Sequence, residues 1–219
     1  MAIEQVEDAP LICTRARGGG TVVFEATALR VGRLLRIRAA IGGGPCTPLE
    51  DFLKETPGLA ELGAPGCIVE LRSSAADETI LATRTRPGEV VVVSLRTYRS
   101  PTPYAPAAIL GYCIASTAAS PLMAAIEDTD GMAALRLTGR QVTSVLCRLA
   151  DVSSLPKREG CATQLRLADL HATLIRRRDE HIVMIGAPYR DFLLEWLRYA
   201  AAGENGDMDV NSMNRSTPL

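Results

Sequence analysis

The two histidines are the side chains best suited to proton transfer at neutral pH, yet neither has the neighbours that catalysis requires. His171 lies within a run typical of a β-strand, where we expect it to face solvent or an adjacent side chain. His181 begins another such run directly after Asp179 and Glu180. The basic run RRRDE at 176–180 is interpreted as a solvated hairpin turn, although a basic turn would also suit an acidic partner surface. We assign neither histidine to catalysis.

The acidic pairs and one cysteine also lack the spacing of a reactive centre. Glu50-Asp51 and Glu127-Asp128 are adjacent in sequence, and on a strand adjacent side chains face opposite sides. They do not form the paired carboxylates of an acid–base site. Cys161 follows a glycine at the start of a strand-like run, so it is either a reactive thiol or a small packed residue. The second interpretation is favoured, because unpaired cysteines usually pack as small hydrophobic side chains.

The cysteines show no metal-binding pattern. None of the six belongs to a CxxC pair: Cys13, Cys46, Cys67, Cys113, Cys147 and Cys161. Because structural zinc sites use tight local pairs of ligands, we expect no metal site. Such scattered cysteines are typical of a reduced, cytoplasmic protein. The acidic N-terminus, with no basic start before a long apolar run, likewise predicts no secretory signal.

Signatures for nucleotide and nucleic-acid binding are also missing from the sequence. The glycine triplets at 18–20 and 42–44 form neither GxGxxG nor GxxxxGK[ST], so we interpret them as turns. Lysine and arginine number 24 against 25 acidic residues, and aromatic residues make up 4% of the chain. This balance excludes a basic, aromatic-rich nucleic-acid surface. We therefore predict no catalytic, cofactor-binding or metal-binding residue in this chain.

A turn and a helix are predicted in the middle of the second half. Asp130-Gly131 stands between the apolar runs 121–128 and 132–137, a pattern that predicts a β-hairpin. Thr138 is a candidate cap for the helix that follows. Apolar residues then recur at helical spacing: Val142, Val145, Leu146 and Leu149.

Three strands and a last helix complete this half. The strand-like runs are 161–168, 170–177 and 180–186, and the helix is expected over 187–203. The apolar stripe of that helix consists of Tyr189, Phe192, Leu193, Trp196 and Leu197. The resulting order β-β-α-β-β-β-α predicts the α+β class, an antiparallel sheet with packed helices.

The first half is less regular. The run 21–41 fits either a strand or a helix, and a short helix is expected from Thr47 to a stop at Pro57-Gly58. Strands are expected at 67–72 and 89–96. We divide the chain into an N-terminal region at 1–80, an α+β domain at 81–203 and a polar, disordered tail at 204–219.

Residues 100–126 carry no charge. Prolines on either side limit a helix here to 107–120, roughly 21 Å long, which is short of the ~30 Å hydrocarbon core of a bilayer. We therefore expect no membrane span. A helix without a polar face must be covered on several sides. It is either enclosed by the core of this chain or packed against a second subunit.

Several weak motifs in a fixed order carry a family resemblance. They are Leu137-Thr138-Gly139, Pro156, Ala162-Thr163-Gln164, Leu174-Ile175-Arg176, Ile182 to Ile185 and Trp196-Leu197. Residues 131–200, which contain them, resemble the closing half of the gamma subunit of heterotetrameric sarcosine oxidase, a relative of the aminomethyltransferase (glycine cleavage T-protein) fold. The segment 86–94 corresponds to an earlier strand of that family. The first 80 residues and the segment 104–123 depart from the family pattern.

The resemblance implies a non-catalytic gamma-type subunit in a complex that oxidatively demethylates sarcosine or another N-methyl amine. Its partners would be alpha, beta and delta-type subunits, and the chain would brace the flavin subunit against the folate-binding subunit. FAD, FMN, NAD and tetrahydrofolate would be bound by those partners and not by this chain. Two alternatives remain: a stand-alone folate-dependent one-carbon transferase, and an adaptor in an unrelated complex.

Overall fold

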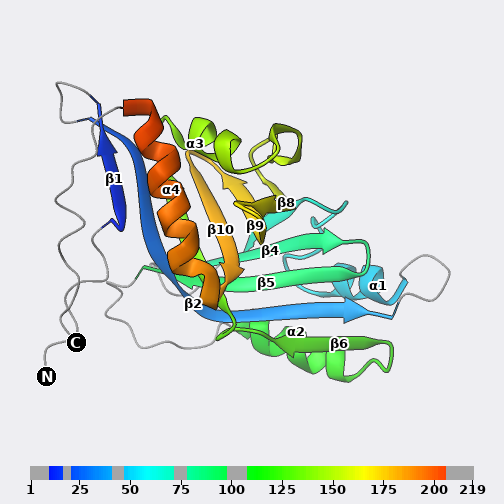
Figure 1. Ribbon diagram of the computed structural model, residues 1–219. Coiled ribbons are helices and arrows are strands. Elements are labelled where there is room, and N and C mark those ends of the chain that lie inside the picture. Colours follow the sequence, from blue (N-terminus) through cyan, green and yellow to red (C-terminus); the bar gives the residue numbers. More distant parts are fainter. Residues whose placement is uncertain (1–9, 17–20, 41–46, 72–77, 98–107, 206–219) are drawn as a thin grey trace, which may run out of the picture.

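The computed structural model describes residues 10–16, 21–40, 47–71, 78–97 and 108–205. In these residues ten strands form one curled antiparallel sheet, and four α-helices pack on it (Figure 1). The expected antiparallel sheet with packed helices is therefore present.

The strands are β1 Ile12–Arg15, β2 Val22–Ala39, β3 Ile68–Leu71, β4 Glu78–Arg86, β5 Glu89–Arg96, β6 Met123–Glu127, β7 Met132–Thr138, β8 Cys161–Leu167, β9 Leu170–Arg177 and β10 Glu180–Gly186. The helices are α1 Thr47–Glu55, α2 Ala108–Ala118, α3 Val142–Leu149 and α4 Arg190–Asn205. Short 3-10 turns lie at Val152–Ser154 and Ala187–Tyr189.

The long strand β2 connects the two halves of the sheet. The strand order is β3-β4-β5-β2-β7-β10-β9-β8, with β1 and β6 also paired to β2. The first part of β2 pairs with β1 and β7, and the second part pairs with β5 and β6. An irregularity between Val31 and Arg33 lies near the start of the pairing with β5. The run 21–41, which fitted a strand or a helix, is thus a strand.

The hairpin predicted at Asp130-Gly131 is wrong. Strands β6 and β7 do not pair with each other; both lie antiparallel to β2, one after the other. Between them, the Asp128 backbone N–H donates to the Leu34 carbonyl at 3.1 Å, and the Leu34 N–H donates to Thr129 Oγ1 at 3.0 Å. Strands β6 and β7 therefore run in the same direction along β2, and the Asp130-Gly131 segment lies between them without reversing the chain. A partner as long as β2 offers backbone groups to both strands, which makes mutual pairing unnecessary.

The two ends of the strand order meet and complete the curl. Cys67, just before β3, forms an isolated antiparallel bridge with Cys161 at the start of β8. Beside this bridge, Arg177 of β9 contacts Glu70 of β3 through two hydrogen bonds of 2.6 and 3.0 Å. Edge strands otherwise present unpaired backbone groups, so this junction protects part of both edges.

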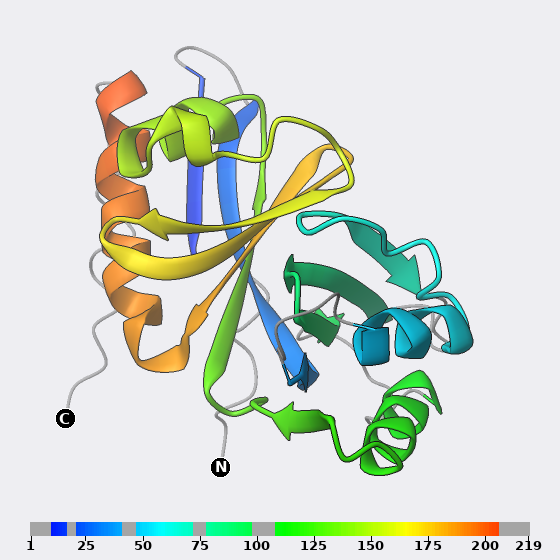
Figure 2. The same cartoon turned by 90° about the vertical axis from the view of Figure 1, so that its right-hand side faces the viewer.

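Three hydrophobic clusters divide the molecule into layers. One cluster lies between the sheet and helices α3 and α4, a second between the sheet and helices α1 and α2, and a third between the facing halves of the curled sheet. Figures 1 and 2 show α3 and α4 at one end of the molecule and α1 and α2 at the other. Full burial of one such Leu or Ile side chain stabilises a fold by about 1.5–3 kcal/mol.

Most elements of the second half agree with the sequence. Strands β8, β9 and β10 lie where expected, joined by tight turns in which Ala168, Asp169 and Arg178 adopt positive φ. The expected cap of α3 is wrong, because Thr138 ends β7 and the N-cap residue is Gln141, whose side chain makes no capping hydrogen bond. Helix α4 continues past Gly203 to Asn205.

The first 80 residues belong to the same sheet as the rest. They contribute β1, β2, α1, β3 and the start of β4, and strands β1 and β4 were not anticipated from the sequence. Helix α1 and strands β3 and β5 lie where expected. Residues 206–219 of the predicted tail, and residues 98–107 before α2, lie outside the described residues.

Candidate functional site

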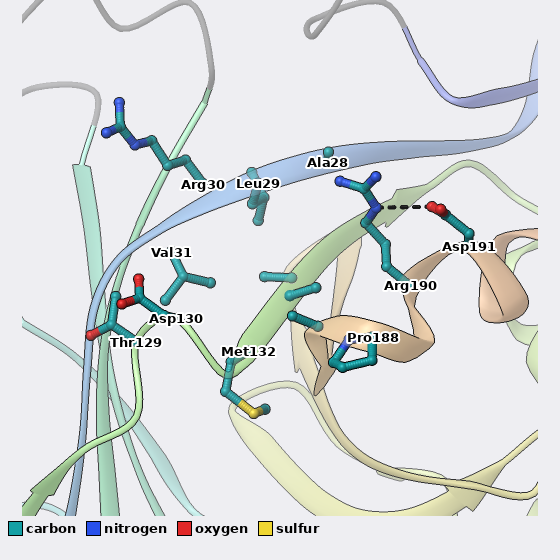
Figure 3. A pocket seen from close by; sticks show the side chains of 13 residues that line it. Ala28, Leu29, Arg30, Val31, Thr129, Asp130, Met132, Pro188, Arg190 and Asp191 are labelled. Carbon is teal, nitrogen blue, oxygen red and sulfur yellow. Dashed lines mark hydrogen bonds and ion pairs between the residues drawn. The ribbon is translucent and has the colours of Figure 1, made fainter. Parts of the chain in front are cut away.

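A groove of about 420 Å³ lies where the middle of β2 meets the segment 129–134 and the start of α4. Its charged side chains are Arg30, Asp130, Arg190 and Asp191. Figure 3 shows Arg30 and Asp130 at one end, and Arg190 and Asp191 at the other. Arg190 Nε donates to Asp191 Oδ1 at 3.1 Å, so these two charges compensate each other.

The groove offers charge and hydrogen bonds but no nucleophile beside a base. None of its lining residues, all in the described part of the chain, is a histidine, cysteine, lysine or glutamate. The Thr129 hydroxyl accepts from the Leu34 N–H and lies 3.3 Å from a Glu127 carboxylate oxygen, so it holds the backbone together. Arginine stays protonated at neutral pH and does not exchange protons. This arrangement suits contact with a small polar group rather than acid–base chemistry.

The two histidines are placed differently. His181 lies on β10 opposite Leu137 of β7 and Arg176 of β9, and is half-buried. Burial lowers the pKa of His181 to about 4, and the positive charge of Arg176 contributes to the same shift. The imidazole is therefore neutral at pH 7. His171 is exposed on β9 opposite Arg166.

Cys161 and His181 do not form a nucleophile–base pair. Cys161 lies opposite Arg176, which in turn lies opposite His181 on the next strand. Because neighbouring strands are about 4.8 Å apart, two strand spacings place the cysteine and the histidine roughly 10 Å apart. Within the described residues, no group of three or more His, Cys, Asp or Glu side chains could hold a metal ion.

The acidic pairs singled out in the sequence are parts of ion pairs. Each carboxylate lies close to one basic group: Glu50 with Arg84 at 2.6 Å, Asp51 with Lys54 at 4.0 Å, Glu127 with Arg33 at 2.8 Å, and Asp128 with Arg36 at 3.0 Å. The hydrogen bond from Arg33 lowers the pKa of Glu127. Three of these pairs connect different elements, so the acidic residues anchor the fold.

A buried carboxylate that sequence reasoning missed lies at the start of β5. Glu89 is 5% exposed and accepts hydrogen bonds from Arg38 at 2.6 Å and Thr85 at 2.7 Å, while Arg36 lies 4.0 Å away. Burial by itself would raise the pKa of Glu89, but the hydrogen bonds and the nearby arginines hold it below its ordinary value. The pairing of β2 with β5 brings Arg36 and Arg38 to Glu89, so no local sequence signal marks this contact.

The basic run at 176–180 is largely occupied within the fold. Arg176 donates to the backbone carbonyl of residue 157 at 3.1 Å. Arg177 bridges Glu70 and Glu180, with contacts of 2.6 and 2.7 Å. Burial would lower the pKa of Arg177, but the hydrogen bonds to both carboxylates raise it. Two of the three arginines are therefore structural, which leaves little of the run for an acidic partner.

Helix α4 and the 3-10 turn before it carry an exposed aromatic face, which we define as Tyr189 of the turn and Phe192, Trp196 and Tyr199 of the helix. Their exposed fractions are 55%, 46%, 45% and 57%. The ring centroids of Phe192 and Trp196 are 6.2 Å apart, and those of Trp196 and Tyr199 are 6.3 Å apart. The stripe predicted from the sequence is therefore split. Its two leucines, Leu193 and Leu197, are buried, whereas its aromatic members lie outside the core.

Among the described residues, helix α2, at the centre of the uncharged stretch, is covered on one face only. Leu110, Cys113 and Thr117 are buried, and burial raises the pKa of the Cys113 thiol to about 11. Gly111 and Tyr112 are exposed on the opposite face. The described core therefore does not enclose this helix. In the part of the chain that the structure describes, every helix is too short or too polar to cross a bilayer.

Comparison with known proteins identifies the fold through solved structures. Neither the protein-family models nor the curated proteins contain a match to this sequence. A chain of heterotetrameric sarcosine oxidase from Corynebacterium sp. U-96, solved with pyrrole 2-carboxylate, matches with a TM-score of 0.60 and 16% identity. Glycine cleavage system aminomethyltransferase T from Bartonella henselae matches with a TM-score of 0.51 and 16% identity. The chain has an aminomethyltransferase-like fold.

The two matches differ in how much of each protein they cover. The similarity to the sarcosine oxidase chain covers 88% of this chain and 90% of that one. The similarity to the aminomethyltransferase covers 77% of this chain but only 44% of the other. This aminomethyltransferase-like chain thus spans less than half of the transferase and nearly all of one chain of the heterotetramer.

Proposed function

We propose that this chain is a non-catalytic, gamma-type subunit of a flavin-dependent complex that oxidatively demethylates sarcosine or another N-methyl amine. The observation that carries this proposal is the coverage: the chain corresponds to 90% of one chain of a heterotetrameric oxidase, against 44% of a single-chain transferase. If this chain were a stand-alone transferase, it would lack the part of the fold that makes up more than half of the aminomethyltransferase. This difference favours a subunit of an assembly.

The exposed aromatic face of α4 supports a role in assembly. Tyrosine, tryptophan and phenylalanine are enriched at the centres of protein interfaces, and tryptophan and tyrosine often contribute most of the binding energy. Three such side chains project from α4 and one from the 3-10 turn before it, with exposed fractions between 45% and 57%. The exposed side of α2 adds a second surface without charged residues. We propose that alpha, beta and delta-type subunits cover these surfaces.

In the proposed complex this chain contributes geometry rather than chemistry. It would brace the flavin subunit against the folate-binding subunit, which keeps the reactive imine or formaldehyde inside the assembly. The groove does not fit tetrahydrofolate, because no residue lining it in the described chain is aromatic and could stack on the pterin. FAD, FMN, NAD and tetrahydrofolate are therefore proposed to bind the partner subunits, in the cytoplasm.

The first test is isolation of the tagged chain from its native cell, followed by a visible spectrum and subunit masses. The expected eluate is yellow, with the absorption bands of flavin, and contains a flavoprotein and a large dinucleotide-binding partner. Turnover of N-methyl amines by this eluate would then identify the substrate. A colourless eluate with unrelated proteins would contradict the proposal in favour of an adaptor. A lone chain that binds tetrahydrofolate would contradict it in favour of a transferase.

Variants test whether the aromatic face of α4 holds the partners. Phe192→Ala combined with Trp196→Ala should abolish recovery of the flavin subunit, while the free energy of unfolding falls by about 1.5–3 kcal/mol, because each ring is about half buried. Val152→Ala is the matched control, because Val152 is an apolar residue outside α4 and is 61% exposed. Recovery of the flavin subunit unchanged by the double substitution would refute the assigned interface.

A further inference from the structure

Cys67 and Cys161 lie directly opposite each other where the two edges of the sheet meet. The residue after each cysteine donates its backbone N–H to the carbonyl of the residue before the other cysteine, at 3.0 and 2.7 Å. These two hydrogen bonds flank the cysteines, which therefore form a non-hydrogen-bonded antiparallel pair. In such pairs the Cα atoms are about 4.5 Å apart and the side chains approach most closely.

The two thiols share one face of the sheet. The residues that follow them, Ile68 and Ala162, contact the cluster between the facing halves of the sheet. Because successive side chains alternate between faces, both cysteines lie on the opposite, outer face. Both are half-buried and free, so small solutes reach them.

The backbone on either side favours close approach of the cysteines. Each cysteine follows a glycine in the left-handed region, Gly66 with φ of 91° and Gly160 with φ of 74°. A Cβ atom at Gly66 would lie only 3.2 Å from the Ala162 carbonyl oxygen. A larger residue would thus push the two edges apart at this point.

We propose that Cys67 and Cys161 are a modification site at which a reversible disulfide joins the two edges of the sheet. The expected Cα separation of about 4.5 Å lies within the range of 4.4–6.8 Å found for disulfides. This inference concerns the chain itself and does not depend on the proposed function.

The oxidant is a small disulfide, such as oxidised glutathione. One cysteine thiolate attacks a sulfur of oxidised glutathione, which forms a mixed disulfide and releases one glutathione thiolate. The second cysteine thiolate attacks the protein sulfur of the mixed disulfide and releases the other glutathione thiolate. Two electrons pass from the cysteine pair to glutathione, and the two thiol protons end on the two glutathione thiolates.

The cross-link would close a loop of about 95 residues, and a loop of that length loses considerable entropy in the unfolded chain. Joined to the hydrogen-bonded contact between Arg177 and Glu70, it would hold the sheet edges together. Oxidation is therefore expected to raise the midpoint of thermal unfolding by about 5–15 °C.

The test exposes the reduced, folded full chain to oxidised glutathione and then maps its peptides without reduction. The expected product is one cross-linked pair of peptides that contains Cys67 and Cys161, with the loss of two hydrogen atoms and a higher unfolding midpoint. Both changes should reverse with dithiothreitol. The peptide map of the unsubstituted chain decides the question without any variant.

Three variants sharpen the result. Cys67→Ser and Cys161→Ser should each retain one glutathionyl group on the remaining cysteine and form no cross-link. The double variant Cys13→Ser/Cys147→Ser, which removes the other two half-buried cysteines among the described residues, should cross-link as the unsubstituted chain does. Separate glutathionylation of both cysteines, a different cysteine pairing, or no reaction at either position would overturn the proposal.

Discussion

Replacing His181 with glutamine is expected to remove part of the acid sensitivity of the fold. His181 is half-buried between Leu137 and Arg176 on the two neighbouring strands. Burial, assisted by the Arg176 charge, lowers its pKa from an ordinary 6.5 to about 4. The folded chain therefore holds a neutral imidazole at a pH at which the unfolded chain already carries a proton there.

The difference in proton binding between the folded and unfolded chain determines how stability changes with pH. Between pH 6.5 and about 4 the unfolded state binds more protons, so stability is complete above pH 6.5 and falls as the pH decreases through this window. At about 1.4 kcal/mol per pH unit, the whole window corresponds to about 3 kcal/mol. Because the imidazole keeps contact with solvent, screening reduces this to about 1–2 kcal/mol. That loss corresponds to a fall of roughly 2–8 °C in the unfolding midpoint.

The assay compares urea unfolding of the wild-type chain, His181→Gln and His171→Gln at several pH values between 7 and 4. The difference in unfolding free energy between wild type and His181→Gln should change by about 1–2 kcal/mol across this range. The exposed His171 supplies the matched control, and its variant should follow the wild-type curve. Carboxylates with lowered pKa values, such as Glu89, are common to all three proteins and cancel in the difference. A His181→Gln curve parallel to that of the wild type would refute the reasoning.

Two further predictions concern the backbone and one ion pair. Gly139 has φ of 107°, and an added Cβ would lie 2.5 Å from the Val23 carbonyl oxygen. Gly139→Ala should therefore lower the free energy of unfolding by about 2 kcal/mol or more, as measured by thermal unfolding. Gly111→Ala, in open space on helix α2, should instead stabilise by about 0.5–1 kcal/mol, and equal effects would contradict the strain argument. Glu70→Gln removes one partner of Arg177 and should cost about 1 kcal/mol in low salt and less in high salt. A loss independent of salt would show that the contact acts through packing.

Local signals in the sequence predicted the elements whose causes are local. Helix α1 lies at Thr47–Glu55, where a helix was expected, because the proline in its first turn has a backbone conformation suited to a helix start. The three C-terminal strands lie where expected because their turns, which include Ala168, Asp169 and Arg178, are two residues long and reverse the chain by their own backbone conformation. The antiparallel sheet with packed helices follows from that order of elements.

The predictions that failed concern residues whose positions depend on contacts with elements distant in sequence. The Asp130-Gly131 signal did not form a hairpin because β2, a hundred or so residues earlier, offers a continuous edge to both β6 and β7. The predicted apolar stripe of the last helix did not show which of its members face the sheet, because helical spacing marks an apolar arc but not the part of it that is buried. The sheet contacts Leu193 and Leu197 and leaves Trp196 exposed.

The sequence by itself determined the local elements, the lack of a recognisable catalytic motif and an uncharged stretch unsuited to crossing a bilayer. These properties depend on residues within a few positions of one another, where propensity and turn geometry act. Only the tertiary structure decided that Cys67 meets Cys161, that Glu89 is buried among arginines and that His181 is neutral. Each of those outcomes depends on which strands become neighbours when the sheet curls, and that is settled by burial of the whole core rather than by any local pattern.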